Sequence, residues 1–106
     1  MVDVEQITEI AMNIITYAGM AKSSYLQGLE AYKKDSKEEA ENLFIKGDEN
    51  FIKAHGFHGN LLAKEADTKI PQITLILSHA EDQLMNAEMI NIMVKEFVEL
   101  YKKERN

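Results

Sequence analysis

The chain of 106 residues contains no cysteine and a single proline. The absence of cysteine excludes disulfide bonds and thiol chemistry, and it fits a reducing compartment. Uninterrupted apolar runs, such as residues 14–15 and 75–77, are far too short to cross a bilayer. Residues 1–5 are acidic and lack the pattern of a signal peptide. We therefore expect a soluble cytoplasmic protein with no segment inserted in a membrane.

Positive charge is also scarce. There are 12 lysine and arginine residues against 18 aspartate and glutamate residues, which gives a formal net charge of -6. A nucleic-acid partner is not expected, because such proteins usually carry a basic patch. The length predicts one domain over residues 1–106. A domain of this size buries a modest core, so oligomerisation would add stability.

Two long segments with helical periodicity fill the first part of the chain. The first begins at a pair, Asp3 and Gln6, that resembles a capping box, and it ends at the polar residues 33–35. The second begins at residues 36–39, which form a capping box of the Ser-x-x-Glu type. It ends at the polar residues 67–69.

A third segment runs from Pro71 to about Lys103, because proline suits the first turn of a helix. Three long helices joined by short turns predict an all-α, antiparallel three-helix bundle. Glycine inside a helix costs about 1 kcal/mol relative to alanine. Each glycine here therefore indicates a close helix–helix contact or a local irregularity, and Gly56 and Gly59 could break the second helix near His55. The glycines within the predicted helices are Gly19, Gly28, Gly47, Gly56 and Gly59.

The third helix carries two stripes, although one buried stripe is enough for a helix of a small bundle. A second stripe with heptad spacing indicates contact with other subunits, where polar residues fix the register. The first stripe, expected to face the other two helices, is Ile76, Ala80, Leu84, Ala87, Ile90, Val94, Phe97 and Tyr101. The second, here called the seam stripe, is Leu75, His79, Asp82, Asn86, Met89, Met93 and Leu100.

Three polar residues, His79, Asp82 and Gln83, share one face of the third helix, because Asp82 and Gln83 follow His79 by three and four residues. His79 is either a structural histidine or a nucleophile. Free imidazole has a pKa of about 6.5, so its neutral form can accept a phosphoryl group near neutral pH. Such a transfer needs donors for the phosphate oxygens, and the amide group of Gln83 could supply them.

Carboxylates and histidines raise the question of a metal. If symmetry brings copies of Asp82 together, a divalent ion such as Mg²⁺ would relieve their repulsion. His55 and His58 lie three residues apart, but the Glu-x-x-His pattern of di-iron bundles is absent. We expect His58 at the surface, and the role of His55 stays open.

The most specific segment is residues 79–85, with the sequence His-Ala-Glu-Asp-Gln-Leu-Met. With other segments, it resembles the lactose/cellobiose-class enzyme IIA of the bacterial sugar phosphotransferase system, over nearly the whole chain. The other similar segments are residues 17–19, 21–23, 54–55, 62–66 and 98–102.

The resemblance implies a nine-helix homotrimer of three-helix subunits. It implies that His79 accepts a phosphoryl group on Nε2 from the phosphocarrier protein HPr. His79 would pass this group to a cysteine of the IIB component, for uptake of β-glucoside-type sugars such as cellobiose, lactose or chitobiose. It also implies that copies of Asp82 bind one divalent metal on the trimer axis, for which we expect Mg²⁺.

The chain departs from the family pattern at two positions. Glutamine is common where Glu81 stands, and histidine is common where Gln83 stands. A Glu81 carboxylate approaching His79 of a neighbouring subunit would favour the protonated ring and repel phosphate, which would slow phosphorylation. Gln83, Glu81 and His55 are the residues expected to stabilise phosphate or to face a partner.

Two alternatives remain at this stage. A histidine-phosphotransfer domain of two-component signalling is also a helical bundle with a surface histidine. It typically has a lysine and small residues after that histidine, whereas Glu81, Asp82 and Met85 follow here. The other alternative is a non-catalytic oligomeric adaptor, whose polar seam residues only fix the register.

Overall fold

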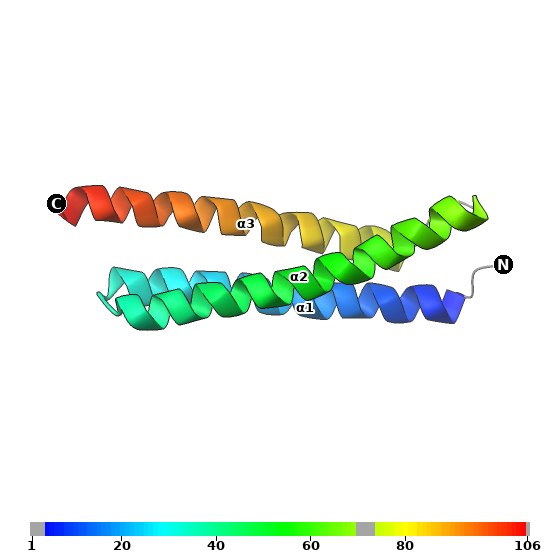
Figure 1. Cartoon of the computed structure of the whole chain (residues 1–106), viewed down its shortest axis with the longest axis horizontal. Coiled ribbons are helices and arrows are strands. Elements are labelled where there is room, and N and C mark those ends of the chain that lie inside the picture. Colours follow the sequence, from blue (N-terminus) through cyan, green and yellow to red (C-terminus); the bar gives the residue numbers. More distant parts are fainter. Residues whose placement is uncertain (1–3, 70–73, 106) are drawn as a thin grey trace.

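Three helices and no strand make up residues 4–69 and 74–105, the part of the chain that the computed structural model describes. The helices are α1 (Val4–Lys33), α2 (Lys37–Thr68) and α3 (Leu75–Arg105). Successive helices run in opposite directions in an elongated bundle of 58 × 20 × 18 Å (Figure 1). The prediction of an all-α, antiparallel three-helix subunit is therefore confirmed. No helix in the described ranges is both long and apolar enough to cross a membrane.

Helix α1 is the centre of the bundle, since α2 and α3 both pack along it and contact each other much less. Its buried residues recur at intervals of three and four, which is the period that predicted the helix. Many buried residues are alanines, which allow the helix axes to approach closely. The main apolar cluster consists of Ile7, Ala11, Ile14, Ala18, Ala54, Leu61, Leu77, Ala80, Leu84 and Ala87.

The turn between α1 and α2 lies at the predicted place but is not capped as predicted. Asp35 adopts the left-handed conformation with φ of 65°, which aspartate tolerates. Ser36 occupies the N-cap position with φ of -89° and ψ of 66°, and its side chain makes no capping hydrogen bond. Its carbonyl oxygen does accept a backbone hydrogen bond of the helix, from the N–H of Ala40 at 2.9 Å. The predicted Ser-x-x-Glu capping bond is therefore wrong.

Helix α3 begins at Leu75, later than Pro71. The Thr74 side-chain oxygen accepts the Leu77 N–H at 3.1 Å, and its carbonyl oxygen accepts the Ser78 N–H at 3.0 Å. Thr74 is thus the N-cap of α3, and this side-chain bond determines where the helix begins. Pro71 itself lies outside the described residues, as does Asp3 of the first expected capping pair.

Two glycines mark close contacts between α1 and α2. A Cβ added at Gly28 would lie 2.5 Å from Cε1 of Phe44, and one at Gly47 would lie 2.6 Å from Cε1 of Tyr25. Both distances are shorter than van der Waals contact allows, so the aromatic rings need glycine opposite them. The interpretation as close helix–helix contacts is confirmed at these positions.

Helix α2 continues without interruption through Gly56 and Gly59. The alternative of a break near His55 is therefore wrong. A Cβ at Gly19, Gly56 or Gly59 would meet nothing within 4 Å, so no contact in the described residues explains these glycines.

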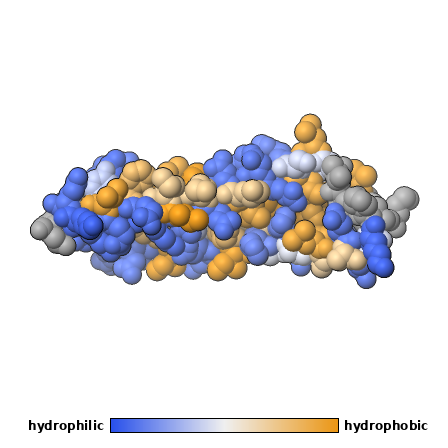
Figure 2. Space-filling view, turned by 90° about the horizontal axis from the view of Figure 1, so that it is seen from above, coloured by the Kyte–Doolittle hydropathy of each residue, from blue (hydrophilic) through white to orange (hydrophobic). Residues whose placement is uncertain are grey.

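The two stripes of α3 have different environments. Half of the first stripe is buried, namely Ala80, Leu84, Ala87 and Val94, and three more of its residues are half-buried, whereas Phe97 is 44% exposed. Leu77 and Val98, which the prediction omitted, are buried. Every residue of the seam stripe is exposed; among its apolar residues, Leu75 is the most exposed at 89% and Met93 the least at 47%. Figure 2, viewed from the side of α3, shows apolar groups along this helix among hydrophilic ones.

Candidate functional site

The predicted face of α3 forms an accessible site near the beginning of the helix. Asp82 and Gln83 lie about one turn after His79 in an unbroken helix, so the three residues share one face as expected. The side chains of His79 and Asp82 are exposed, and Gln83 is half-buried. An exposed imidazole beside a half-buried amide can receive a group from a partner and hold it against the helix.

Gln83 is linked to α1 by a residue that sequence spacing did not single out. The ammonium group of Lys22 donates a short hydrogen bond to Oε1 of Gln83. The oxygen of the amide is therefore occupied, and its NH₂ group retains two donors. Lys22 does lie in residues 21–23, one of the segments that carry the family resemblance. Spacing along α3 alone could not reveal it, because it lies 61 positions before Gln83.

Glu81 is linked to α2. Nε2 of His58 lies 3.2 Å from Oε1 of Glu81. The His58 side chain is 21% exposed and that of Glu81 is 45% exposed, so the pair lies at the margin of the bundle. His58 was expected to be a surface histidine; it is half-buried and paired. Within the chain, this contact draws the Glu81 carboxylate towards α2.

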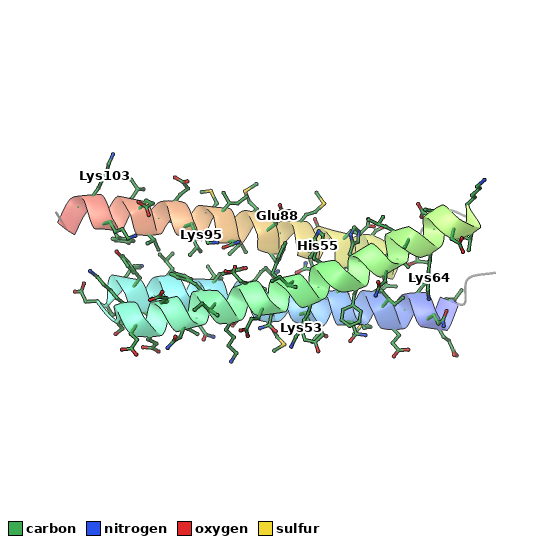
Figure 3. The ribbon with its side chains drawn as sticks, viewed as in Figure 1. Lys53, His55, Lys64, Glu88, Lys95 and Lys103 are labelled. Carbon is green, nitrogen blue, oxygen red and sulfur yellow. The ribbon has the colours of Figure 1, made fainter. Side chains whose placement is uncertain are left out.

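His55 is exposed on α2, where Figure 3 labels it. Its ring centroid lies 6.1 Å from that of Phe51, one turn earlier, with the ring planes tilted by 38°. Among the expected phosphate-stabilising residues, Gln83 and Glu81 thus have partners on other helices. The contact of His55 is within its own helix.

Within the described residues of one chain, the side chains do not form a metal site. No group of three histidine, aspartate or glutamate side chains in the described ranges could hold an ion. Asp82 is a single exposed carboxylate, and hard divalent cations require several oxygen ligands. The described residues of one chain therefore do not fit a resident metal, and a site through Asp82 would require several copies.

A second polar cluster joins the three helices away from His79. The Tyr25 hydroxyl donates to Oδ1 of Asp48 at 2.8 Å, and Nζ of Lys95 lies 4.0 Å from the same oxygen. Lys95 is labelled on α3 in Figure 3. Burial of Tyr25, together with its hydrogen bond to Asp48, raises the pKa of the phenol well above its usual range. This cluster stabilises the protonated phenol in the folded chain.

Comparison with known proteins gives consistent matches over most of the chain. Residues 9–102 match the family described as the lactose/cellobiose-specific IIA subunit of the PTS system. The oligo-beta-mannoside-specific EIIA component of Bacillus subtilis (strain 168) is 35% identical over 94 residues, covering 89% of this chain and 86% of that protein. The lichenan-specific phosphotransferase enzyme IIA component of the same organism is 34% identical, covering 93% and 90%. The crystal structure of the PTS cellobiose-specific enzyme IIA from Bacillus anthracis superposes with a TM-score of 0.88 at 31% identity, covering 99% and 94%.

Proposed function

The chain belongs to the lactose/cellobiose-specific IIA family of the sugar phosphotransferase system, and we propose that His79 is the residue through which it carries phosphoryl groups. IIA proteins are phosphotransferase components that carry such groups. The observation that carries the proposal is the exposed imidazole of His79 in the segment 79–85, within the matched region. Family membership favours this role over a two-component phosphotransfer domain or a non-catalytic adaptor.

The proposed reaction needs no oxidant, reductant or water. The Nε2 lone pair of a neutral His79 ring, protonated at Nδ1, attacks the phosphorus of the phosphorylated donor. An N–P bond forms while the bond between phosphorus and the donor breaks, and the donor keeps that electron pair. A cysteine thiolate of the acceptor then attacks the same phosphorus. An S–P bond forms, and the electron pair of the N–P bond returns to Nε2 of His79.

We assign the donor as HPr and the acceptor as the IIB component, both in the cytoplasm, for sugars of the β-glucoside type. The surface near His79 is suited to a protein partner because Leu75 and Met85 are 89% and 67% exposed. The carboxylate of Glu88, exposed on the same helix (Figure 3), would complement a basic partner surface.

The exposed seam stripe supports a homotrimer in which three α3 helices pack together. A set of exposed methionine and leucine side chains with heptad spacing is suited to such packing. The assembly would contain nine helices and bring three copies of Asp82 to the axis. Three carboxylates would supply the ligands that one chain lacks, and Mg²⁺ is the proposed ion.

The test is phosphorylation by enzyme I, HPr and phosphoenolpyruvate, measured by intact mass. We expect a gain of one phosphate per chain, and the phosphorylated protein, once separated from the donor system, should lose it when the IIB component is added. The His79→Gln variant should remain folded by circular dichroism and take up none. His55→Gln is the matched control and should be phosphorylated. Stoichiometric phosphate uptake by His79→Gln would overturn the proposal.

A further inference from the structure

We infer that Lys22 is a catalytic residue of the His79 site, whose ammonium group binds the oxygens of the phosphoryl group during transfer. Gln83 is the positioning residue that holds Lys22 at the site. The inference rests on the proposed function, because it assigns the source of positive charge for the same reaction.

The geometry brings the charge of Lys22 to the turn that follows His79. Lys22 lies on α1, is half-buried, and bonds across the α1–α3 contact to Oε1 of Gln83. Gln83 follows His79 by four residues, and side chains with that spacing have Cβ atoms about 5–6 Å apart on a helix surface. A lysine side chain held at Gln83 is therefore close enough to reach a phosphoryl group on His79.

The partner of Lys22 determines how much charge remains available. Gln83 is neutral, so the hydrogen bond orients the ammonium group without cancelling its charge. Two of the three N–H donors of Lys22 remain for phosphate oxygens. Several other lysines contact anionic or aromatic groups elsewhere in the bundle. These pairs are Lys33 with Glu30, Lys95 with Asp48, Lys102 with Glu99, and Lys53 with the ring of Tyr17.

The surroundings of His79 make a cation necessary for efficient transfer. Glu81 and Asp82 lie two and three residues after His79, and the chain has a formal net charge of -6. An incoming phosphoryl group is itself anionic, so carboxylates nearby oppose its approach. The contact with His58 draws Glu81 towards α2, and Lys22 supplies positive charge from the α1 side.

Lys22 transfers no proton in this scheme. As Nε2 of His79 forms its bond to phosphorus and the bond to the donor breaks, negative charge spreads over the equatorial oxygens. Hydrogen bonds from the ammonium group stabilise that charge, which is how electrostatic catalysis of phosphoryl transfer generally works. The same bonds persist to the phosphohistidine product.

The test compares single-turnover transfer from phosphorylated HPr at saturating HPr, using the full chain. Lys22→Met removes the charge and keeps most of the side-chain volume. We expect it to slow the saturated rate on the order of 100-fold, the usual effect of removing one transition-state donor. Lys22→Arg keeps the charge and should stay within about tenfold of the wild type by the same reasoning. Lys53→Met removes a lysine that lies over Tyr17 and should leave the rate unchanged.

A second variant keeps the contact and cancels the charge. Gln83→Glu would retain a partner for Lys22 but neutralise it, so the folded protein should be slowed as strongly as Lys22→Met. Thermal unfolding of each variant establishes that it is folded. If wild-type protein takes up phosphate and both variants match its saturated rate, the inference is wrong while the proposed function stands. If the wild-type protein takes up none, both are wrong.

Discussion

Gly47 has a defined structural role because its lack of a Cβ makes room for the ring of Tyr25. That ring is fully buried and its hydroxyl is bonded to Asp48, so it cannot move aside. Gly47→Ala should therefore lower the free energy of unfolding by about 1–3 kcal/mol, the usual cost of overpacking. Gly56→Ala is the matched control, because open space surrounds that position.

The control should instead raise stability by up to about 1 kcal/mol, because alanine favours a helix. Urea denaturation of both variants measures the difference. Equal effects on the two glycines would contradict the packing argument.

Tyr25 makes the free energy of unfolding depend on pH, and the direction of that dependence can be predicted. Burial and then the Asp48 hydrogen bond raise the pKa of its phenol, so the folded state favours the protonated form. This contribution to stability is complete below about pH 10, the ordinary pKa of tyrosine, and is lost as the pH rises further. Tyr25→Phe should be less stable than the wild type by about 1 kcal/mol near pH 8, since it lacks the hydrogen bond.

Between pH 9 and 11, the free energy of unfolding should fall more steeply for the wild type than for Tyr25→Phe. Denaturation at several pH values measures the two slopes. Tyr17→Phe, which changes a ring stacked on Phe57, is the control and should keep the wild-type slope. Equal slopes for wild type and Tyr25→Phe would refute this assignment.

The N-termini of α2 and α3 differ in whether a side chain caps them. Thr74 caps α3 through its hydroxyl oxygen, whereas Ser36 occupies the N-cap of α2 without a side-chain bond. Thr74→Ala should therefore lower the free energy of unfolding by about 1 kcal/mol, the typical value of an N-cap. Ser36→Ala should change it by less than half as much. Thermal unfolding of the two variants checks the order, and a larger loss for Ser36→Ala would contradict it.

Helical periodicity predicted all three helices, but their local details depended on geometry that the pattern does not contain. The residues after Ser36 match a capping box, yet its backbone ψ of 66° leaves the hydroxyl unbonded. The buried residues of α3 keep a regular spacing of three and four that includes Leu77 and Val98, whereas the predicted stripe took the neighbouring residues Ile76 and Phe97 instead.

The site was predictable where its residues lie on one helix. The spacing of His79, Asp82 and Gln83 along α3 predicts that their side chains share one face. Lys22 and His58 reach the site from α1 and α2, 61 and 23 positions away from their partners. Such contacts depend on how the helices pack, so the periodicity of one helix does not reveal them.

At the scale of the whole molecule, the exposed seam stripe predicts self-association. Sedimentation of the wild-type protein should give the mass of three chains at micromolar concentration. Met93→Lys places a charge in the stripe and should shift the protein to monomers, because burying an unpaired charge is costly. Ile45→Lys changes an exposed residue of α2 and should leave the trimer intact. A monomeric wild-type protein, or equal effects of both variants, would overturn the proposed assembly.

The central claim is that His79, and neither of the other two histidines, carries the phosphoryl group. Its most direct test is to phosphorylate the protein with phosphorylated HPr and to locate the phosphate by fragmentation mass spectrometry under conditions that preserve phosphohistidine. The account predicts one phosphate per chain, bonded to the imidazole of His79. Phosphate on His55 or His58, or none while HPr is active, would contradict it.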